Sequence, residues 1–377
     1  MVKKLKFFSI STQYIKAGQK LEFDLYVNSS TLEGRERFHR ILKRGKILSE
    51  DFFNDHIKKH PHIYVPEHQR KSYFTNVVKR QSSHGEKVDA IKSIAIDHMV
   101  HLFEGGESSE SLLSNIEQSR DVVEVIVDLI QHKSMNDLYK TLSELGYHDC
   151  YTYDHSINVC MYSIVFYKFL KPQASKFELT TTGLSGLLHD LGKLKVSNKI
   201  LNNVGPLKDC DFDVIKKHPT YGAELLSGCD CQNISPEMLR EIQAVVLEHH
   251  ENINGSGYPK GMKGEEITFL AKMVAIIDFF DAVTTKRSYH EPLHVGDSLS
   301  LMSKSVDKKI DRVLFNEFRR SIFVLSEGKQ DISVGDDFDP CRPYNELPIQ
   351  KIKPKKTSIS LKTGKQVKEV DPLKKAS

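Results

Sequence analysis

Residues 184–193 read Leu184-Ser185-Gly186-Leu187-Leu188-His189-Asp190-Leu191-Gly192-Lys193, an apolar helical segment that ends in a His-Asp pair. Burying such a pair is unfavourable unless partners satisfy both groups. An imidazole offers one neutral nitrogen ligand, and a carboxylate can bridge two metal ions. The stretch therefore predicts a helix that ends at a metal site.

Further polar residues interrupt apolar segments elsewhere. His249 and His250 follow the apolar residues 244–247, and Asp278 follows 274–277. With 17 histidines in the chain, any single one is more often a surface or satisfied core residue than a ligand. Convergence on one cation cluster explains these residues together, so we expect two ions about 3.5–4 Å apart that activate water and hold a phosphate. The candidate ligands are His155, His189, Asp190, His218, His249, His250 and Asp278.

The residue types narrow the chemistry. Imidazole and carboxylate without thiolate suit iron, manganese, cobalt, nickel or zinc, and spacing does not choose among them. Asp281, one turn beyond Asp278, either accepts a hydrogen bond from a ligand histidine or is a charge on the helix surface. Lys193 either contacts a phosphate or donates a proton to a leaving oxygen, unless it is a solvated surface lysine. The loop 254–259, Asn-Gly-Ser-Gly-Tyr-Pro, allows close backbone approach to a ligand and offers an aromatic ring.

The bulk composition is that of a globular protein long enough for two domains, with 377 residues, 39% hydrophobic and 28% charged. Its longest apolar run, 269–283, is interrupted by Lys272, Asp278 and Asp281, so no membrane span is expected. The N-terminus has no long apolar core or cleavage site. The six cysteines form no CxxC pair, and Cys229 and Cys231 form only a CxC, which argues against structural disulfides and for a cytoplasmic location.

The net charge of +4 is unevenly distributed. Residues 1–80 hold 17 Lys and Arg against 8 acids, residues 349–377 hold 9 Lys against 2 acids, and subtraction leaves about −12 for the middle. Basic segments of this kind can bind nucleic acid or an acidic partner. The tail lacks interleaved aromatic residues and a known reader motif, so nucleic-acid binding is not expected. A homodimer or a signalling partner bound through the N-terminal module stays open.

Hydrophobic periodicity predicts a mainly α protein, an all-helical domain preceded by a small α+β module. In residues 1–82 we expect a strand or hairpin from Leu5 to about Tyr26, short helices at 36–42 and 50–59, and a strand at 63–65. A helical linker region, 83–148, contains an amphipathic stripe over 112–130. In the domain 149–327 we expect helices around 155–170, 178–190, 211–228, 236–250, 267–285, 294–303 and 310–325, and then a basic, flexible tail, 328–377. Ser235 and Pro236 mark a helix start, and Pro219 places His218 at a helix break.

Taken together, these motifs resemble an HD-GYP domain, a bacterial subset of the HD phosphohydrolases. The resemblance rests on His189-Asp190-Leu191-Gly192-Lys193, His218-Pro219, His249-His250-Glu251 and Gly257-Tyr258-Pro259. It runs from about Tyr151 to about Tyr289, with a weaker continuation to about residue 327. The N-terminal 80 residues resemble, more loosely, a module often found before this domain.

The resemblance implies a metal-dependent phosphodiesterase that hydrolyses cyclic di-GMP, a bacterial second messenger, to pGpG and/or GMP. It implies two or three metal ions, often iron or manganese, with Asp190 as the bridging ligand. Asp190 and Lys193 are the expected catalytic residues. The expected substrate-binding residues are Lys193, Gly257, Tyr258 and Arg287. Two alternatives stay open: a phosphodiesterase for another cyclic dinucleotide such as cyclic GMP-AMP, and a non-catalytic cyclic di-GMP receptor.

Three positions depart from the family pattern. Tyr151 stands four residues before His155, where members with a third metal carry Glu, so we expect a binuclear site. Asn254 stands where Asp is usual, and His290 stands where Lys or Arg often follows the Arg287 motif. None of these departures removes a metal ligand, so we expect an active enzyme.

Overall fold

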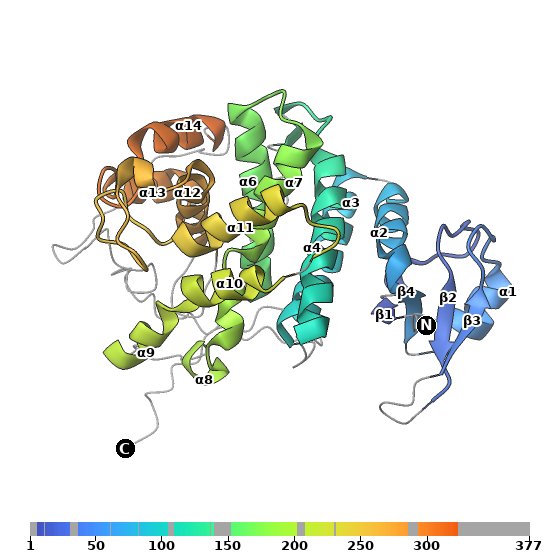
Figure 1. Cartoon of the computed structure of the whole chain (residues 1–377). Helices are drawn as coiled ribbons and strands as arrows, with labels where there is room; N and C mark the ends of the chain where they lie inside the picture. Colours follow the sequence, from blue (N-terminus) through green and yellow to red (C-terminus); the bar gives the residue numbers. More distant parts are fainter. Residues whose placement is uncertain are drawn as a thin grey trace, which may run out of the picture.

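The structure is a computed structural model that describes residues 6–10, 12–30, 37–60, 62–81, 83–104, 109–135, 137–138, 152–201, 208–229, 231–285 and 293–322. A small sheet with short helices forms one end of the molecule, and a larger group of helices forms the rest (Figure 1). The expected fold class, mainly α with an α+β module in front, is confirmed. The tail expected over 328–377 lies outside the described residues.

The N-terminal sheet has four antiparallel strands in the order β1-β4-β2-β3. They are β1 Phe7–Ile10, β2 Leu25–Asn28, β3 Phe38–Leu42 and β4 Ile63–Pro66. Side chains alternate along each strand, so one face carries the buried pairs Phe8 opposite Val65 and Ile10 opposite Ile63. This inner face packs on helix α2 (Arg70–Lys79), where Phe8 meets the rings of Tyr73 and Phe74.

Short helical segments complete the module: η1 Thr12–Tyr14, α1 Glu50–Phe52, η2 Phe53–Ile57 and η3 Glu67–Gln69. The expected strand at 63–65 and the helical segment within 50–59 agree with the structure. The expected strand or hairpin at Leu5 to about Tyr26 is only partly right, because β1 is followed by η1 and β2 begins at Leu25. The helix expected at 36–42 is wrong over Phe38–Leu42, because pairing with β2 outweighs a weak local helix preference.

Three helices lead from the sheet into the larger part: α2 Arg70–Lys79, α3 His84–Glu104 and α4 Ser109–Ile130. The apolar stripe predicted over 112–130 is confirmed as a helix, with Ile116, Val123 and Ile126 fully buried. Glu124 on α4 forms ion pairs with Lys71 on α2 and with Arg120 one turn earlier. The described helices of the linker region, α3 and α4, are therefore packed rather than extended.

The larger part consists of helices. The expected ranges match within a few residues, whereas the short helical segments at 191–195, 198–201 and 264–266 were not expected. The helices are α6 Thr152–Leu170, α7 Lys176–Leu188, η4 Leu191–Lys195, α8 Asn198–Leu201, α9 Asp209–Ile215, α10 His218–Ser227, α11 Pro236–Glu248, η5 Gly264–Glu266, α12 Phe269–Thr284, α13 Val295–Ser303 and α14 Arg312–Ile322. The predicted helix over 211–228 is two helices, and His218 begins the second directly after the break. Ser235 caps α11 by accepting from the Met238 amide, and Ser175 caps α7 in a capping box with Glu178.

Two glycines allow close packing between the helices that later carry the site and their neighbours. A Cβ atom on Gly192 would lie 1.8 Å from the His218 carbonyl oxygen, so η4 meets the start of α10 only because residue 192 is glycine. A Cβ atom on Gly183 would lie 2.6 Å from Cγ1 of Val123, so α7 packs closely against α4. Helices α4, α6, α7 and α12 share one hydrophobic core.

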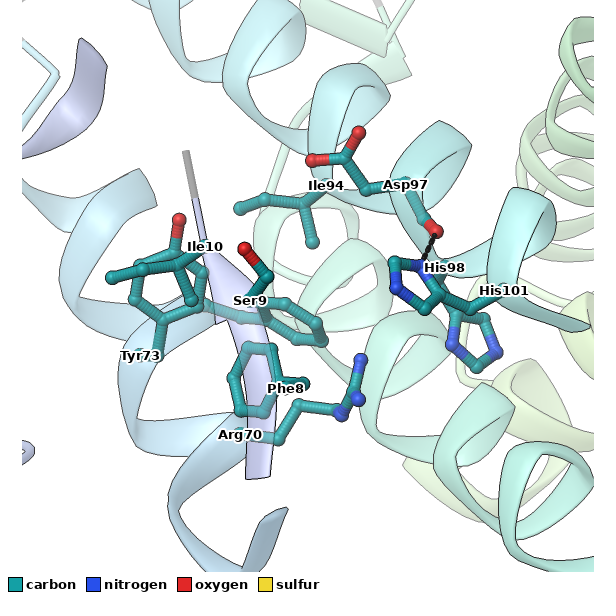
Figure 2. Close-up of a pocket in the computed structure, with 10 residues that line it drawn as sticks. Phe8, Ser9, Ile10, Arg70, Tyr73, Ile94, Asp97, His98 and His101 are labelled. Carbon is teal, nitrogen blue, oxygen red and sulfur yellow. Dashed lines mark hydrogen bonds between the residues drawn. The ribbon is translucent and has the colours of Figure 1, made fainter. Parts of the chain in front are cut away.

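A small recess lies where β1, α2 and α3 meet. Figure 2 shows the side chains that line it, with Arg70 between Phe8 and the histidines of α3. His98 is buried there, and its Nε2 atom lies 2.9 Å from Ser119 Oγ. The lining residues are Phe8, Ser9, Ile10, Arg70, Tyr73, Phe74, Ile94, Asp97, His98 and His101.

Two further expectations concern cysteines and membranes. The expectation that no cysteines pair is wrong for Cys229 and Cys231, whose sulfur atoms are joined in a disulfide. Cys160 and Cys210 are free, the first buried and the second exposed. Within the described ranges, none of the helices combines the length and the apolar character that crossing a bilayer requires.

Candidate metal centre

The seven residues that the sequence suggested as ligands come together in the structure as two neighbouring groups. Within each group, one possible ligand atom of every residue lies within 4.8 Å of the others. The first group is Asp190, His218, His249 and His250, and the second is His155, His189 and Asp278.

Five helices supply these side chains. His155 lies in the first turn of α6, and Asp278 lies inside α12. His189 and Asp190 follow α7, His249 and His250 follow α11, and His218 begins α10. Placing pairs at helix ends lets the chain turn away directly after the polar residues, so the apolar helix faces remain in the core.

The carboxylate of Asp190 lies between the two groups. Its Oδ1 atom is 3.2 Å from Nε2 of His218 and 4.0 Å from Nε2 of His249. Its Oδ2 atom is 3.3 Å from Nε2 of His189 and 3.9 Å from Nε2 of His155. Each oxygen therefore faces a different group, which is the arrangement that a carboxylate bridging two cations requires.

Three of the imidazoles are oriented by backbone carbonyl groups. Nδ1 of His189 donates to the Gly186 oxygen at 2.8 Å, Nδ1 of His218 donates to the Ile215 oxygen at 2.8 Å, and Nδ1 of His249 donates to the Val246 oxygen at 3.0 Å. A carbonyl can only accept, so the proton lies on Nδ1 in each ring. The Nε2 atoms are thus the lone-pair atoms, and they point at Asp190 and one another.

His155 is oriented instead by a carboxylate. Its Nδ1 atom donates to Oδ2 of Asp281 at 2.7 Å, and its Nε2 atom lies 3.2 Å from Oδ1 of Asp278. Asp281 also accepts hydrogen bonds from Asn158 at 2.9 Å and from Thr285 at 3.0 Å. Burial acts to lower the pKa of His155, but the hydrogen bonds to Asp278 and Asp281 outweigh it and raise the pKa to about 9. Of the two interpretations of Asp281, the structure favours the acceptor that orients a histidine.

The donor set fits divalent cations. Among the described residues, neither Nε2 of His189 nor Oδ1 of Asp190 has a hydrogen-bond partner, although both atoms are buried. Burial, together with the neighbouring imidazoles of His189 and His218, lowers the pKa of His249 to about 3. Burial acts to raise the pKa of Asp190, but Lys193 and the neighbouring imidazoles hold it well below its usual range. At neutral pH His249 and the carboxylate of Asp190 thus offer lone pairs, whereas His155 has to release a proton before it can bind a metal. Orphaned buried atoms of this kind are expected where a metal binds.

Lys193 lies on η4 at the edge of this cluster. Its Nζ atom is 2.5 Å from Oδ2 of Asp190, and its side chain is 27% exposed. Lys195, two residues later, turns outward and pairs with Glu224. Lys193 is therefore the cation of this segment that could reach both the carboxylate and a bound anion.

The glycine loop after α11 packs directly on the imidazoles. The ring of Tyr258 stacks on His250, with centroids 4.9 Å apart, and its backbone amide donates to the His250 carbonyl oxygen at 3.2 Å. A Cβ atom on Gly257 would lie 2.3 Å from the Asn252 nitrogen, so this approach requires glycine. Burial and the charges of Asp190 and Asp278 raise the pKa of Tyr258 well above its ordinary value, which keeps its hydroxyl protonated.

Two acidic residues that hold this loop were not singled out by the sequence. The buried Glu251 carboxylate accepts from the amides of Lys260 at 2.7 Å and Met262 at 2.9 Å. Glu248 accepts from the Thr268 amide at 2.9 Å, immediately before α12. A signal was available, because an acid on either side of the pair His249-His250 is hard to bury without donors. Three residues of interest, Tyr151, Arg287 and His290, lie outside the described residues.

Comparison with known proteins places this arrangement in a family context. Residues 165–314 match the HD domain family. A cyclic di-GMP phosphodiesterase of Pseudomonas aeruginosa is 35% identical over 189 residues, which cover 50% of this chain and 43% of the relative. A 3′3′-cGAMP-specific phosphodiesterase of Vibrio cholerae is 28% identical over 177 residues, 47% of this chain and 36% of the relative. The matches thus span less than half of these relatives' length.

A solved structure shares the overall fold. It is an HDG"Y"P protein from Bdellovibrio bacteriovorus, which matches 85% of this chain and 100% of its own length with a TM-score of 0.53 and 20% sequence identity. At that identity the likeness concerns the fold, and it extends well beyond the residues that match the HD domain family.

Proposed function

We propose that this chain carries an HD domain of the HD-GYP type and that this domain is a metal-dependent phosphodiesterase for cyclic dinucleotides, with cyclic di-GMP as its first candidate substrate. The relatives of the domain include enzymes named for cyclic di-GMP and for 3′3′-cGAMP. The proposal for this chain rests on that kinship together with the geometry of the site.

The observation that carries the proposal is the position of Asp190. Its two oxygens face two different sets of nitrogens, Nε2 of His218 at 3.2 Å and Nε2 of His189 at 3.3 Å. This supports a site for two divalent ions, with His218, His249 and His250 on one side and His155, His189 and Asp278 on the other. Iron and manganese suit the mixed imidazole and carboxylate ligands.

Two bound ions would supply an activated water near neutral pH and would neutralise charge on the phosphate under attack. The residues of the chain have separate tasks. Asp281 and the backbone carbonyls fix the imidazoles, so little reorganisation is needed when the site is loaded. Lys193, at the edge of the cluster, is placed to contact a phosphate oxygen or to donate a proton to the 3′ oxygen that leaves.

Three residues are proposed to bind the nucleotide. Tyr258 offers a ring fixed against His250, and Gly257 lets the loop backbone come close to the site. Arg287 is proposed from the family resemblance to hold a phosphate or a base through its planar guanidinium. The finer proposal is that cyclic di-GMP is cut to pGpG and then, in part, to GMP.

The test is a product assay linked to metal analysis. The protein is purified without oxygen, its iron and manganese are quantified, and chromatography follows its action on cyclic di-GMP, 3′3′-cGAMP and cyclic di-AMP. Preferred turnover of cyclic di-GMP by protein containing about two ions supports the proposal. Preferred turnover of the hybrid dinucleotide would redirect the substrate assignment. Tight binding without product in fully loaded protein would identify a receptor and overturn the catalytic proposal.

A further inference from the structure

The outer face of the N-terminal sheet carries a cluster of aromatic rings that lies outside the hydrophobic core. The rings of Phe7 and Phe38 stack with centroids 4.1 Å apart, Phe7 contacts Tyr26 at 4.8 Å, and Phe38 contacts Tyr64 at 5.0 Å. All four residues are partly exposed, and none of them belongs to the core that the inner face joins. We call these four residues the aromatic face.

The register of the strands sets the order of side chains across this face. Tyr26 on β2 lies directly opposite Tyr64 on β4, and these are the two central strands of the sheet. On the other side of Tyr26 lies Arg40 of β3, its partner in that ladder. Residues opposite each other in a sheet point to the same face. A cation therefore stands in the same row as the two central tyrosines.

Positive charge continues along β3, an edge strand, and into the turn that follows it. Arg37, Arg40, Lys43, Arg44 and Lys46 are all exposed, and residues 37–46 include no acid. Within the described part of the chain, none of the five forms an ion pair. The buried acid Asp24 accepts hydrogen bonds from Gln69 and from the Arg44 amide, and it also interacts electrostatically with Arg40 and Arg44.

The aromatic face lies far from the metal centre. Figure 1 shows the sheet at one end of the molecule, beyond α2, with α12, α13 and α14 at the other end. The inner face of the sheet is occupied by α2, and among the described residues no helix of the larger part packs on the aromatic face. A ligand bound there would therefore act separately from the hydrolysis of the substrate.

We propose that the aromatic face and the basic edge strand together bind single-stranded nucleic acid, whose bases stack on the exposed rings while its phosphates lie along Arg37–Lys46. Unpaired bases present flat faces that stack on aromatic side chains, and exposed cations neutralise the backbone. Charge complementarity selects this occupant, because five exposed cations beside the rings match a polyanion. From the sequence, nucleic-acid binding was not expected, because only the tail was considered, and its lysines lie without interleaved aromatic residues. In the folded sheet, cations and aromatic rings lie side by side.

The experiment measures the binding of a fluorescein-labelled 12-nucleotide oligouridylate to the full chain by anisotropy, at rising salt. Tyr26→Leu and Tyr64→Leu remove one stacking surface each and keep an apolar side chain; each should weaken binding about 5- to 100-fold. Arg40→Gln should weaken binding and reduce the slope of log affinity against log salt by roughly 0.7. Phe177→Leu and Arg320→Gln, exposed residues on α7 and α14, are the matched controls and should bind as the parent does.

Three outcomes would overturn the proposal. The first is equal affinity for a duplex of the same length, because paired bases cannot stack on the rings. The second is unchanged oligouridylate affinity in both tyrosine variants with retained metal content. In the third, sedimentation shows that the tyrosine variants dissociate a dimer while oligouridylate does not bind the parent. The aromatic face would then be an interface between two copies of the chain.

Discussion

Asp281 accepts a hydrogen bond from Nδ1 of His155 at 2.7 Å and thereby turns the other ring nitrogen toward Asp278 and Asp190. Asp281 does not itself face the other imidazoles of the cluster. It lies behind His155, buried on α12, and two further donors hold it in place. The hydrogen bond between Asp281 and His155 therefore adds Asp281 to the proposed metal centre, as a residue that supports one of the seven candidate ligands.

Replacing Asp281 should loosen the metal site without removing a ligand. Asp281→Ala leaves Nδ1 of His155 without its acceptor, so affinity for Mn²⁺ should fall about 10- to 100-fold. Calorimetric titration of metal-free protein measures this, with Asp213→Ala, a change at an exposed acid on α9, as the control. Unchanged Mn²⁺ affinity in the Asp281 variant would show that the hydrogen bond is structural only.

Replacing Asp190 should have a larger effect, because both groups of nitrogens face its carboxylate. Asp190→Ala should remove at least one of the two ions and abolish hydrolysis, since the bridge is lost. Metal quantification of the purified variant and a product assay check both parts. Full metal content with normal turnover would refute the assignment of Asp190 as a bridging ligand.

Lys193 and Lys195 provide a matched pair on one short helix. Lys193→Ala should leave the metal content intact and slow turnover by roughly 10²–10⁴-fold if Lys193 acts as a general acid. Lys195→Ala should change neither quantity, because that side chain pairs with Glu224 away from the cluster. The measurement is the turnover rate of each variant at saturating substrate. Equal rates for the two variants would show that Lys193 is an ordinary surface lysine.

Glycine at position 192 should be required for stability. In Gly192→Ala the new methyl group would meet the His218 carbonyl oxygen at 1.8 Å, so η4 and α10 must separate. We expect a loss of about 3 kcal/mol or more in the free energy of unfolding, together with weaker metal binding. Gly228→Ala is the control, because its nearest neighbour would lie 3.9 Å away. Urea unfolding of both variants gives the comparison, and equal stabilities would contradict the packing described for Gly192.

The buried His98 should make stability depend on pH. Burial, and then the charges of Arg70 and His101, hold the pKa of His98 well below its ordinary value. Below about pH 6.5 the unfolded chain therefore binds a proton that the folded chain does not, and stability falls as pH decreases, by up to about 1.4 kcal/mol per unit. Above about pH 6.5 the contribution of the neutral His98 to the free energy of unfolding is fully present.

His98→Gln removes the titrating ring and tests this dependence. Unfolding by urea at pH 7.5 and at pH 5.5 should show the variant gaining stability relative to the parent at the lower pH. The control is His56→Gln, which removes an exposed histidine of the N-terminal module. In the opposite outcome, variant and parent differ in free energy of unfolding by the same amount at pH 7.5 and pH 5.5. That result would rule out the proposed protonation of His98 in the unfolded chain.

The larger helices could be predicted from the sequence because each carries a long apolar stripe. Helix α4 and helix α11 lie close to their predicted ranges, and the cap at Ser235 is where the sequence suggested. Strand β3 was missed, because five residues carry little periodicity and the pairing partner β2 decides their conformation. The disulfide between Cys229 and Cys231 was missed because the argument used spacing patterns alone.

At the site, the sequence indicated which residues meet but not how they are held. His189, Asp190 and Asp278 stood out as polar residues in apolar surroundings, and the structure brings them together. The contact of Glu251 with two loop amides depends on the path of residues 252–262, which spacing does not specify. The approach of Gly192 to His218 likewise depends on how two helices cross.

The close packing of Gly183 on α7 against Val123 on α4 limits where the chain can be truncated. Ile116, Val122, Val123, Ile126 and Ile130 on α4 are almost completely shielded from solvent, and they belong to the same core as α6 and α12. Removing everything before residue 149 would delete this stripe, expose the apolar surfaces of α6 and α7 that pack on it, and invite aggregation. The shortest piece that keeps the proposed catalytic half intact therefore starts near the beginning of α3, about 65 residues earlier than the sequence motifs alone suggest.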